Sequence, residues 1–196
     1  MKKGGDIMAI NVKDILSKGL LELVENNLLD SITIKQLLNH TGVSRQTFYN
    51  HFLDKNDLIQ YIYITKIIPD YHDDNMNMNF KESLIVSFQN MKKYHKFLKE
   101  ACMYEGQNNL KDYMCEHCKE FDLKWHQSLY GDKPMSEALR FATIYHASAS
   151  SAMTLSWILS DMPVSCEEMA DMITRMRGIG MDKLFEDGDN KNPYHI

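Results

Sequence analysis

One stretch of twenty residues, from Thr33 to Phe52, constrains the fold of this chain more than any other. In its first half the apolar residues Ile34, Leu37 and Leu38 recur at the i, i+3 and i+4 positions of a helix. A short helix with this spacing can bury one face, and Thr33 before it is a good N-terminal cap. The first half therefore predicts a short amphipathic helix.

The second half of the stretch predicts a sharp turn and another short helix. Gly42 tolerates the positive φ with which helices often end, and Ser44 can cap a helix whose Phe48 and Phe52 share one face. Two short helices joined in this way form a helix-turn-helix, whose second helix enters the DNA major groove. The alternative is a small helical hairpin in a globular core, but that leaves the outward polar residues of the second helix unexplained. Those residues are Gln46 and Asn50, with Thr47 and Tyr49 on the flanks.

A longer motif around this turn resembles the DNA-binding domain of the TetR family of bacterial transcriptional regulators. It reads Thr-Gly-Val-Ser-x-x-Thr-Phe-Tyr-x-x-Phe from Thr41 to Phe52, and Asp54, Lys55 and Leu58 follow at once. The resemblance covers residues 8–66 and implies a three-helix DNA-binding head joined to the body through a fourth helix. It also implies phosphate contacts by Tyr49, His51 and Lys55. The predicted DNA-binding residues are Thr33, Lys35, Ser44, Arg45, Gln46, Thr47, Tyr49, Asn50, His51 and Lys55.

The remainder of the chain predicts an all-α fold. Apolar residues at helical spacing favour helices over 11–27, 54–68, 80–104, 109–129, 135–160 and 166–185, and no stretch has the alternation of a strand. Gly19 lies within the first of these helices, which predicts the close approach of another helix. Pro69 and a polar run over 70–79 separate a helix-turn-helix domain, 8–66, from a ligand-sensing and dimerisation domain, 67–186. Residues 187–196 read as a flexible tail.

Charge bears on how such a protein would bind DNA. The chain has a net charge of -5, and up to residue 66 it carries 8 Lys or Arg against 7 Asp or Glu. This small excess predicts that affinity for double-stranded operator DNA depends on dimerisation and on helix N-termini that donate to phosphates. The four cysteines, the absence of a signal-like apolar segment and the absence of a run long enough to span a membrane predict a cytoplasmic protein with reduced thiols and no membrane partner.

Small residues follow one stripe of the expected helix over 135–160. Small side chains let another helix come near, so the stripe predicts a homodimer interface, although a helix crossing within one chain would use it equally well. Residues 157–170 are similar to TetR-family C-terminal domains of the dihydroxyacetone kinase activator type, which implies that the last two helices pair with their copies as a four-helix bundle. The predicted interface residues are Ala142, Tyr145, Ala149, Ala152, Ser156 and Trp157.

A ligand pocket in the body is a further expectation. Fourteen methionines and ten tyrosines supply adaptable lining, although each candidate could equally belong to the core. The resemblance implies a small effector without naming it, and some relatives use protein partners instead. The candidates for pocket lining are Tyr94, Phe97, Tyr104, Phe121, Trp125, Tyr145, His146 and Met153.

Other chemistry has weak support in the sequence. Cys115 and Cys118 form a single C-x2-C pair inside an expected helix, whereas a structural zinc site needs four convergent ligands, so packing thiols are the favoured interpretation. No phosphate-binding loop, nucleophile elbow or metalloprotease motif occurs. We therefore expect no metal, no cofactor and no enzymatic activity. The predicted function is a transcriptional repressor relieved by an effector; the alternatives are an activator of the same fold and a helical protein-interaction module without DNA binding.

Overall fold

The computed structural model describes residues 11–69, 79–130, 133–179 and 181. The head comprises α1 (Val12–Val24), the 3-10 turn η1 (Leu29–Ser31), α2 (Ile34–Thr41), α3 (Arg45–Tyr49) and α4 (Lys55–Ile62). A π-helical turn, η2 (Tyr63–Ile67), extends α4 towards Pro69. At its C-terminal cap the amide of Ile68 donates to the carbonyl of Tyr63 at 3.1 Å. The fourth helix of the head thus runs over 55–67 without a gap.

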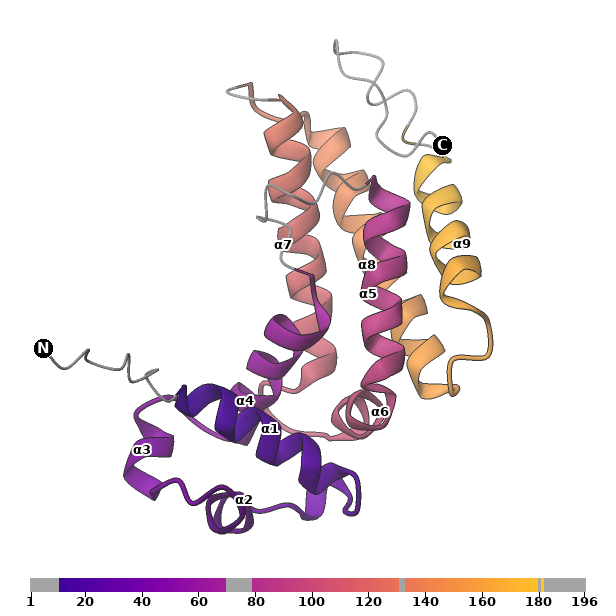
Figure 1. The fold of residues 1–196 in the computed structure, drawn as a ribbon. Helices are drawn as coiled ribbons and strands as arrows, with labels where there is room; N and C mark the ends of the chain where they lie inside the picture. Colours follow the sequence, from indigo (N-terminus) through magenta and orange to yellow (C-terminus); the bar gives the residue numbers. More distant parts are fainter. Residues whose placement is uncertain (1–10, 70–78, 131–132, 180, 182–196) are drawn as a thin grey trace, which may run out of the picture.

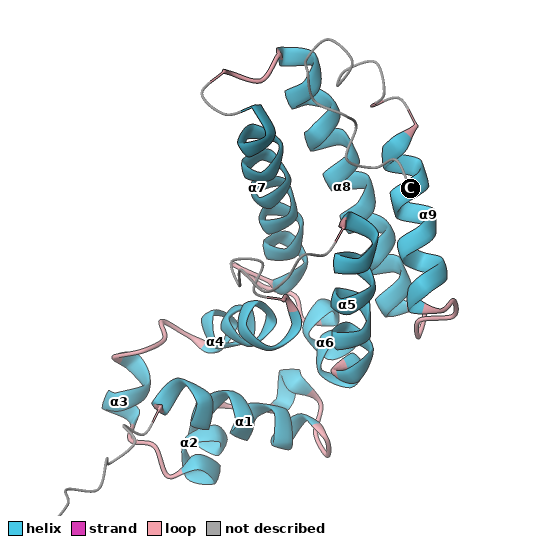
Figure 2. Cartoon of the chain, turned by 45° about the horizontal axis from the view of Figure 1, so that its top comes forward, coloured by secondary structure: helices cyan, strands magenta, loops and turns pink. Residues whose placement is uncertain are grey.

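The body comprises α5 (Phe80–Lys93), α6 (His95–Met103), α7 (Leu110–Tyr130), α8 (Glu137–Leu159) and α9 (Cys166–Gly178). Helices α5, α7, α8 and α9 run side by side, and α6 crosses at the end of α5 nearest the head (Figure 1). The view in Figure 2 shows the same two parts, with α1 to α4 gathered at one end of the upright body helices. The described residues contain helices and no strand, so the predicted all-α fold is confirmed.

Three expected helices have different limits in the structure. The helix expected over 80–104 is two helices, because Tyr94 adopts φ -105° and ψ 24° and turns the chain between α5 and α6. No Gly or Pro marks this turn, and its cause is tertiary: α5 packs along α9, whereas α6 packs against η1 and α8. The second helix of the helix-turn-helix ends at Tyr49. Helix α9 ends at Gly178, and most of the expected residues 179–185 lie outside the described part of the chain.

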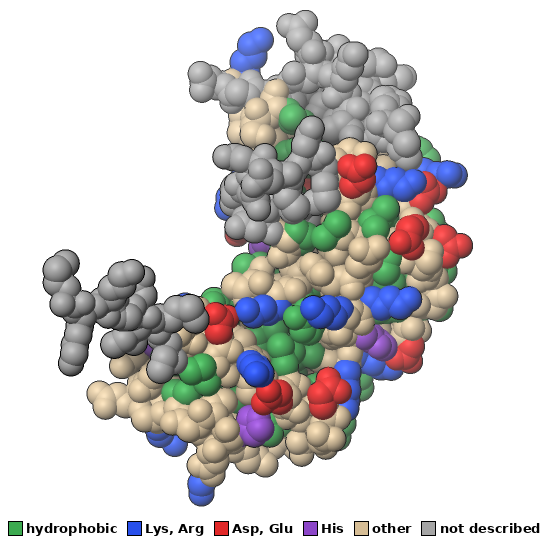
Figure 3. Space-filling model, in the orientation of Figure 1, with side chains coloured by type: hydrophobic (Ala, Val, Ile, Leu, Met, Phe, Trp, Pro, Cys, Tyr) green, Lys and Arg blue, Asp and Glu red, His purple; other side chains and the backbone are tan. Residues whose placement is uncertain are grey.

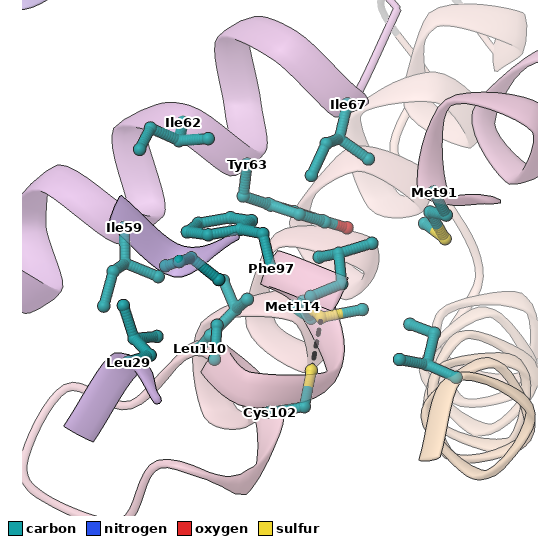
Figure 4. Packing of buried hydrophobic residues seen from close by; sticks show 14 of the residues in the cluster. Leu29, Ile59, Ile62, Tyr63, Ile67, Met91, Phe97, Cys102, Leu110 and Met114 are labelled. Carbon is teal, nitrogen blue, oxygen red and sulfur yellow. Dashed lines mark hydrogen bonds between the residues drawn. The ribbon is translucent and has the colours of Figure 1, made fainter. Parts of the chain in front are cut away.

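One apolar core runs through both head and body. It includes buried residues of α1, α3 and α4 together with buried residues of α5, α6, α7 and α9. Figure 4 shows Ile59 and Tyr63, from α4 and η2, facing Phe97 of α6 and Met114 of α7. Leu29 of η1 lies in the same cluster, so the 3-10 turn helps to seal the head against the body.

Gly19 is the point of closest approach between α1 and α2. A Cβ atom at residue 19 would lie 2.2 Å from Cγ2 of Thr41 and 3.4 Å from Cδ1 of Leu37. The close approach that the sequence predicted for Gly19 is therefore present.

Gly19→Ala is expected to destabilise the protein by about 1–3 kcal/mol, because the overpacked methyl group forces α1 and α2 apart. The gain in helix propensity, about 1 kcal/mol, offsets part of this cost. Urea unfolding monitored by circular dichroism measures the difference. The control is Lys18→Ala, at an exposed position of the same helix, and a Gly19→Ala protein more stable than the parent would contradict the packing described.

Candidate DNA-binding surface and ligand pocket

The helix-turn-helix is fixed by side-chain caps and one left-handed residue. Thr33 and Gln36 form a reciprocal capping box at the start of α2, in which Thr33 Oγ1 accepts from the Gln36 amide at 3.2 Å. Gly42 ends α2 with φ 71° and ψ 7°. Ser44 Oγ then accepts from the Thr47 amide at 3.0 Å and begins α3. Residues that the sequence identified as stop and start signals therefore set the angle between the two helices.

The caps occupy three side chains that were predicted to bind DNA. Thr33 and Ser44 hold helix ends, and the hydroxyl groups of Ser44 and Thr47 lie 2.7 Å apart. Phe48 is fully buried beneath α3, which fixes the rotation of the helix about its axis. The remaining predicted residues of this surface are exposed; they are Lys35, Arg45, Gln46, Tyr49, Asn50 and His51.

The exposed face of α2 and α3 is polar but not strongly basic. Basic and acidic side chains are interspersed over the visible face of the molecule (Figure 3), whereas residues 33–53 contain two strong bases, Lys35 and Arg45, and no Asp or Glu. The Arg45 guanidinium lies 5.5 Å from the ring centre of Tyr49, one turn further along α3. This face can therefore contact base edges and phosphates through single side chains, but it lacks a dense positive patch for strong non-specific binding.

Lys55 has a structural role, and its predicted contact with phosphate is corrected. Its ammonium donates to the carbonyl oxygens of Leu29 at 2.9 Å and Ile32 at 3.0 Å, and lies 3.5 Å from that of Asp30. It also lies 4.7 Å from the ring centre of Tyr104. Burial lowers the pKa of Lys55, and the charge of Asp30 opposes that shift. The three donors are engaged on the head–body side of α4, so the ammonium is not available to a phosphate.

Further polar contacts tie the head to the body. The Leu29 amide donates to Glu100 of α6 at 3.1 Å. On α4, the side-chain amides of Asn56 and Gln60 donate to the carbonyls of Gln107 and Asn108, each at 2.8 Å. These contacts connect η1 to α6, and α4 to the loop between α6 and α7.

A pocket of about 100 Å³ opens in the body beside the head. Tyr63 and Ile68 of the segment that leaves the head form part of its wall. The apolar side of the pocket comes mainly from α5 and α7, and the polar side from α7, α8 and α9. The other lining residues are Phe80, Ser83, Leu84, Ser87, Phe88, Met91, Met114, His117, Cys118, Phe121, Asp122, Ser150, Ser151, Thr154, Ile173 and Arg177.

A buried ion pair forms the polar end of this pocket. Arg177 donates from one terminal nitrogen to Asp122 Oδ2, and from Nε to Ser150 Oγ at 3.0 Å. Both charged side chains are about 3% exposed. Burial raises the pKa of Asp122, and the Arg177 guanidinium opposes that shift. Burial also raises the pKa of the neighbouring Cys118 thiol, which keeps this sulfur a neutral packing group.

Seven of the eight residues predicted to line a ligand pocket lie outside this one; Phe121 is the exception. Phe97 belongs to the head–body core, Tyr104 covers Lys55, and Tyr94 turns the chain between α5 and α6. Trp125 stacks on Phe80 with ring centres 5.5 Å apart. The other three lie on α8 and do not line the pocket: Tyr145 and Met153 are exposed, and His146 is partly buried, where burial and the nearby Arg177 charge lower its pKa.

The charged residues of the pocket were missed by the sequence interpretation because they are far apart in the sequence. Arg177 and Asp122 are 55 residues apart and look like ordinary surface charges in the sequence. No motif joins them, because their partnership arises only when α9 packs beside α7. The prediction favoured large aromatic residues instead, and most of these fill the core.

Exposed apolar side chains gather on the last two helices. Seven of the eleven large apolar side chains that are exposed among the described residues belong to α8, to α9 or to the residue that caps α9. The small residues Ala149, Ala152 and Ser156 are exposed on α8 as well. We call this set the α8–α9 apolar surface; its large members are Phe141, Tyr145, Met153, Leu159, Met172, Met176 and Ile179.

Two of the predicted interface residues, Trp157 and Ala142, are not exposed on this surface. Trp157 is 4% exposed and its indole Nε1 donates to the carbonyl of Val164 at 3.1 Å, so it is a core residue and its predicted place on the interface is corrected. Ala142 is partly buried against Leu139. Tyr145, Ala149, Ala152 and Ser156 lie on the α8–α9 apolar surface.

Two other features of the described residues concern metals and membranes. Cys115 and Cys118 are free thiols on α7, and no group of three or more His, Cys, Asp or Glu side chains in the described part of the chain converges as metal ligands would. None of the described helices combines the length and apolar character needed to cross a membrane.

Comparisons with known proteins match this chain to a family model and to solved structures. A family model, TetR_C_8, described as "Transcriptional regulator C-terminal region", matches residues 78–177. Among solved structures, "Dihydroxyacetone kinase operon activator DhaS" is similar with a TM-score of 0.61 and 20% sequence identity, over 86% of this chain and 95% of that chain. At that identity the structural likeness shows a shared fold. A search of curated proteins gives no match.

Proposed function

The chain belongs to the TetR family of transcriptional regulators, whose C-terminal region it carries over residues 78–177; from this premise we propose that it binds operator DNA as a homodimer, represses transcription and is released by a small effector. The head would read the operator, the α8–α9 apolar surface would join two copies, and the body pocket would take the effector. Each part has separate support.

The observation that carries the proposal is the geometry of α3. Ser44 caps this helix and Phe48 anchors it, so Arg45 and Gln46 at its start and Asn50 at its C-terminal cap face solvent. An outward polar face on the second helix of a helix-turn-helix is the arrangement that reads base edges in the major groove. Gln46 could bond to adenine and Arg45 to guanine.

Effector control is supported by the position of the pocket. Tyr63 and Ile68, which line it, belong to the segment that continues α4 out of the head. A ligand that displaces these residues would tilt α4 and change the distance between the two recognition helices of a dimer. Ordinary coupling energies of about 1–3 kcal/mol suffice, and by reciprocity operator DNA would weaken ligand binding by the same factor.

Activation is the second candidate for the sign of regulation. The printed name of the similar solved structure describes an operon activator. Repression and activation use the same DNA-binding geometry and differ in where the operator lies relative to the promoter. A reporter gene under the selected operator, with and without the protein, separates them.

We expect Gln46→Ala to relax specificity at one base pair in each half-site. Loss of a good base contact costs about 1–3 kcal/mol against the preferred base, which is roughly 5- to 150-fold in affinity. The measurement is binding to an operator selected from random DNA and to its single-base variants. Lys35→Ala should instead weaken all variants alike and reduce the salt slope by about one unit per site.

The matched control is Gln89→Ala, which removes an exposed glutamine from α5, in the body. Identical base profiles for Gln46→Ala and Lys35→Ala would show that α3 does not read the major groove. Failure of random selection to yield any preferred sequence would favour the alternative, a helical interaction module without DNA binding.

A further inference from the structure

The body pocket combines an apolar wall with one compact polar end. Its apolar side includes Leu84 and Phe88 of α5 and Met114 of α7. Its polar end includes Asp122, Thr154 and other groups around Arg177. We propose that the pocket binds an uncharged molecule of about the size of one aromatic ring, which donates a hydroxyl hydrogen bond at the Asp122–Thr154 end. The assignment of this ligand as an effector rests on the proposed function; its binding does not.

The volume of the pocket limits the size of the ligand. The volume of about 100 Å³ is somewhat below that of the ~150 Å³ apolar cavity known to take up a benzene ring, and the pocket is open on one side. Met91 and Met114 both line it, and their flexible side chains can adjust to a ring. A single substituted ring or an aliphatic chain of similar bulk therefore fits, whereas a multi-ring ligand does not.

The ligand is expected to be uncharged, because the Arg177 guanidinium is already engaged by protein groups. Arg177 engages Asp122, Ser150 and, at 3.8 Å, the sulfur of Cys118, while the Phe80 ring centre lies 4.9 Å from its central carbon. The ion pair with Asp122 leaves this end of the pocket with no net charge. An anion would meet the Asp122 carboxylate, and a cation would meet the guanidinium. Either would lose its hydration without gaining a free counterion.

The hydrogen-bonding capacity that remains points to a hydroxyl donor. Thr154 is 7% exposed, and its side chain lines the pocket. Asp122 lines the pocket as well and accepts from Arg177 through Oδ2, and a carboxylate has capacity for further donors. A ligand hydroxyl at this end can therefore donate to the Asp122 carboxylate and accept from the Thr154 hydroxyl.

A matched set of ring compounds tests this chemistry by isothermal titration calorimetry on the full chain. The probes are 4-methylphenol, toluene, 4-methylbenzoate and 4-methylbenzylammonium, which share a ring and a methyl group and differ in the polar end. We expect 4-methylphenol to bind at least about tenfold more tightly than toluene, because a hydrogen bond to a charged group contributes a free energy of that size. Both ions should bind at least about tenfold more weakly than 4-methylphenol.

Two variants locate the site. Thr154→Val removes the hydroxyl at nearly constant volume and should weaken 4-methylphenol about three- to tenfold while leaving toluene unchanged. Leu84→Trp should fill the pocket and abolish binding of both. Thr65→Val, on the exposed face of η2, is the control and should change neither affinity. Methyl NMR signals of Met91 and Met114 should shift on addition of 4-methylphenol, which tests the site without any substitution.

Each outcome bears on the proposal. Equal affinity for 4-methylphenol and toluene, or tightest binding of either ion, would overturn the assigned chemistry. Failure of the methionine signals to shift would overturn the site. If 4-methylphenol binds as expected but leaves operator affinity unchanged, the pocket assignment stands and effector control through it fails.

Discussion

Replacing Ala149 by arginine is expected to convert the protein to monomers and to weaken operator binding by roughly 10²- to 10⁴-fold. Ala149 is exposed within the α8–α9 apolar surface, which we propose joins two copies, and a small side chain there would allow two helices to come close. The long charged side chain would separate the helices and leave a charge in an apolar interface. Operator affinity falls because a dimer binds two half-sites at high effective concentration, whereas a monomer binds only one.

Light scattering at micromolar concentration and a gel-shift titration measure the two effects. Ser128→Arg introduces the same charge at an exposed position on α7, and should remain dimeric with full DNA affinity. Ala152→Arg repeats the test one turn further along α8. A monomeric parent protein, or an Ala149→Arg protein that stays dimeric, would show that this surface has another use.

Arg177→Met is expected to destabilise the protein by about 3–5 kcal/mol and to lower its melting temperature by roughly 6–20 °C. The substitution leaves the Asp122 carboxylate buried with no counterion. The double variant Asp122→Leu with Arg177→Met should recover most of the loss, because two apolar groups of similar volume can replace a buried pair at little cost. Arg175→Met is the control, since Arg175 is 69% exposed and its surface ion pair with Asp171 contributes at most about 1 kcal/mol.

The defect of Arg177→Met should also depend on pH. Burial raises the pKa of Asp122, and without Arg177 nothing opposes this shift, so the folded state of the variant binds a proton more tightly than the unfolded chain. Its stability relative to the parent is therefore greatest at low pH and is lost as pH rises through the raised pKa. Urea unfolding at a fixed protein concentration, compared between pH 5 and pH 7, should show the larger deficit at pH 7. A deficit that grew on acidification would contradict this account.

Local signals predicted the head well, and long-range packing explains most of what they missed. Thr33, Gly42 and Ser44 act through hydrogen bonds and backbone angles within a few residues, so the sequence alone locates the helix-turn-helix. The turn at Tyr94 has no local signal, because it arises from the different packing partners of α5 and α6.

The same distinction applies to single residues. Lys55 was expected at phosphate by resemblance, but its ammonium is held by carbonyls of the 29–32 turn, which no spacing rule brings near it. Trp157 and Tyr145 both stand in the small-residue stretch, and only the packing of the segment around Val164 decides that one is core and the other surface. The polar end of the pocket is likewise assembled from three helices.

The apolar core that crosses from head to body has a consequence for how the protein unfolds. Leu29, Ile59 and Tyr63 on the head side share buried contacts with Phe97 and Met114 on the body side. A head cut away near residue 66 would expose these side chains to water and lose a large part of its hydrophobic stabilisation. We therefore expect the two parts to unfold as one cooperative unit in a single transition, because each depends on the other to cover its apolar side chains.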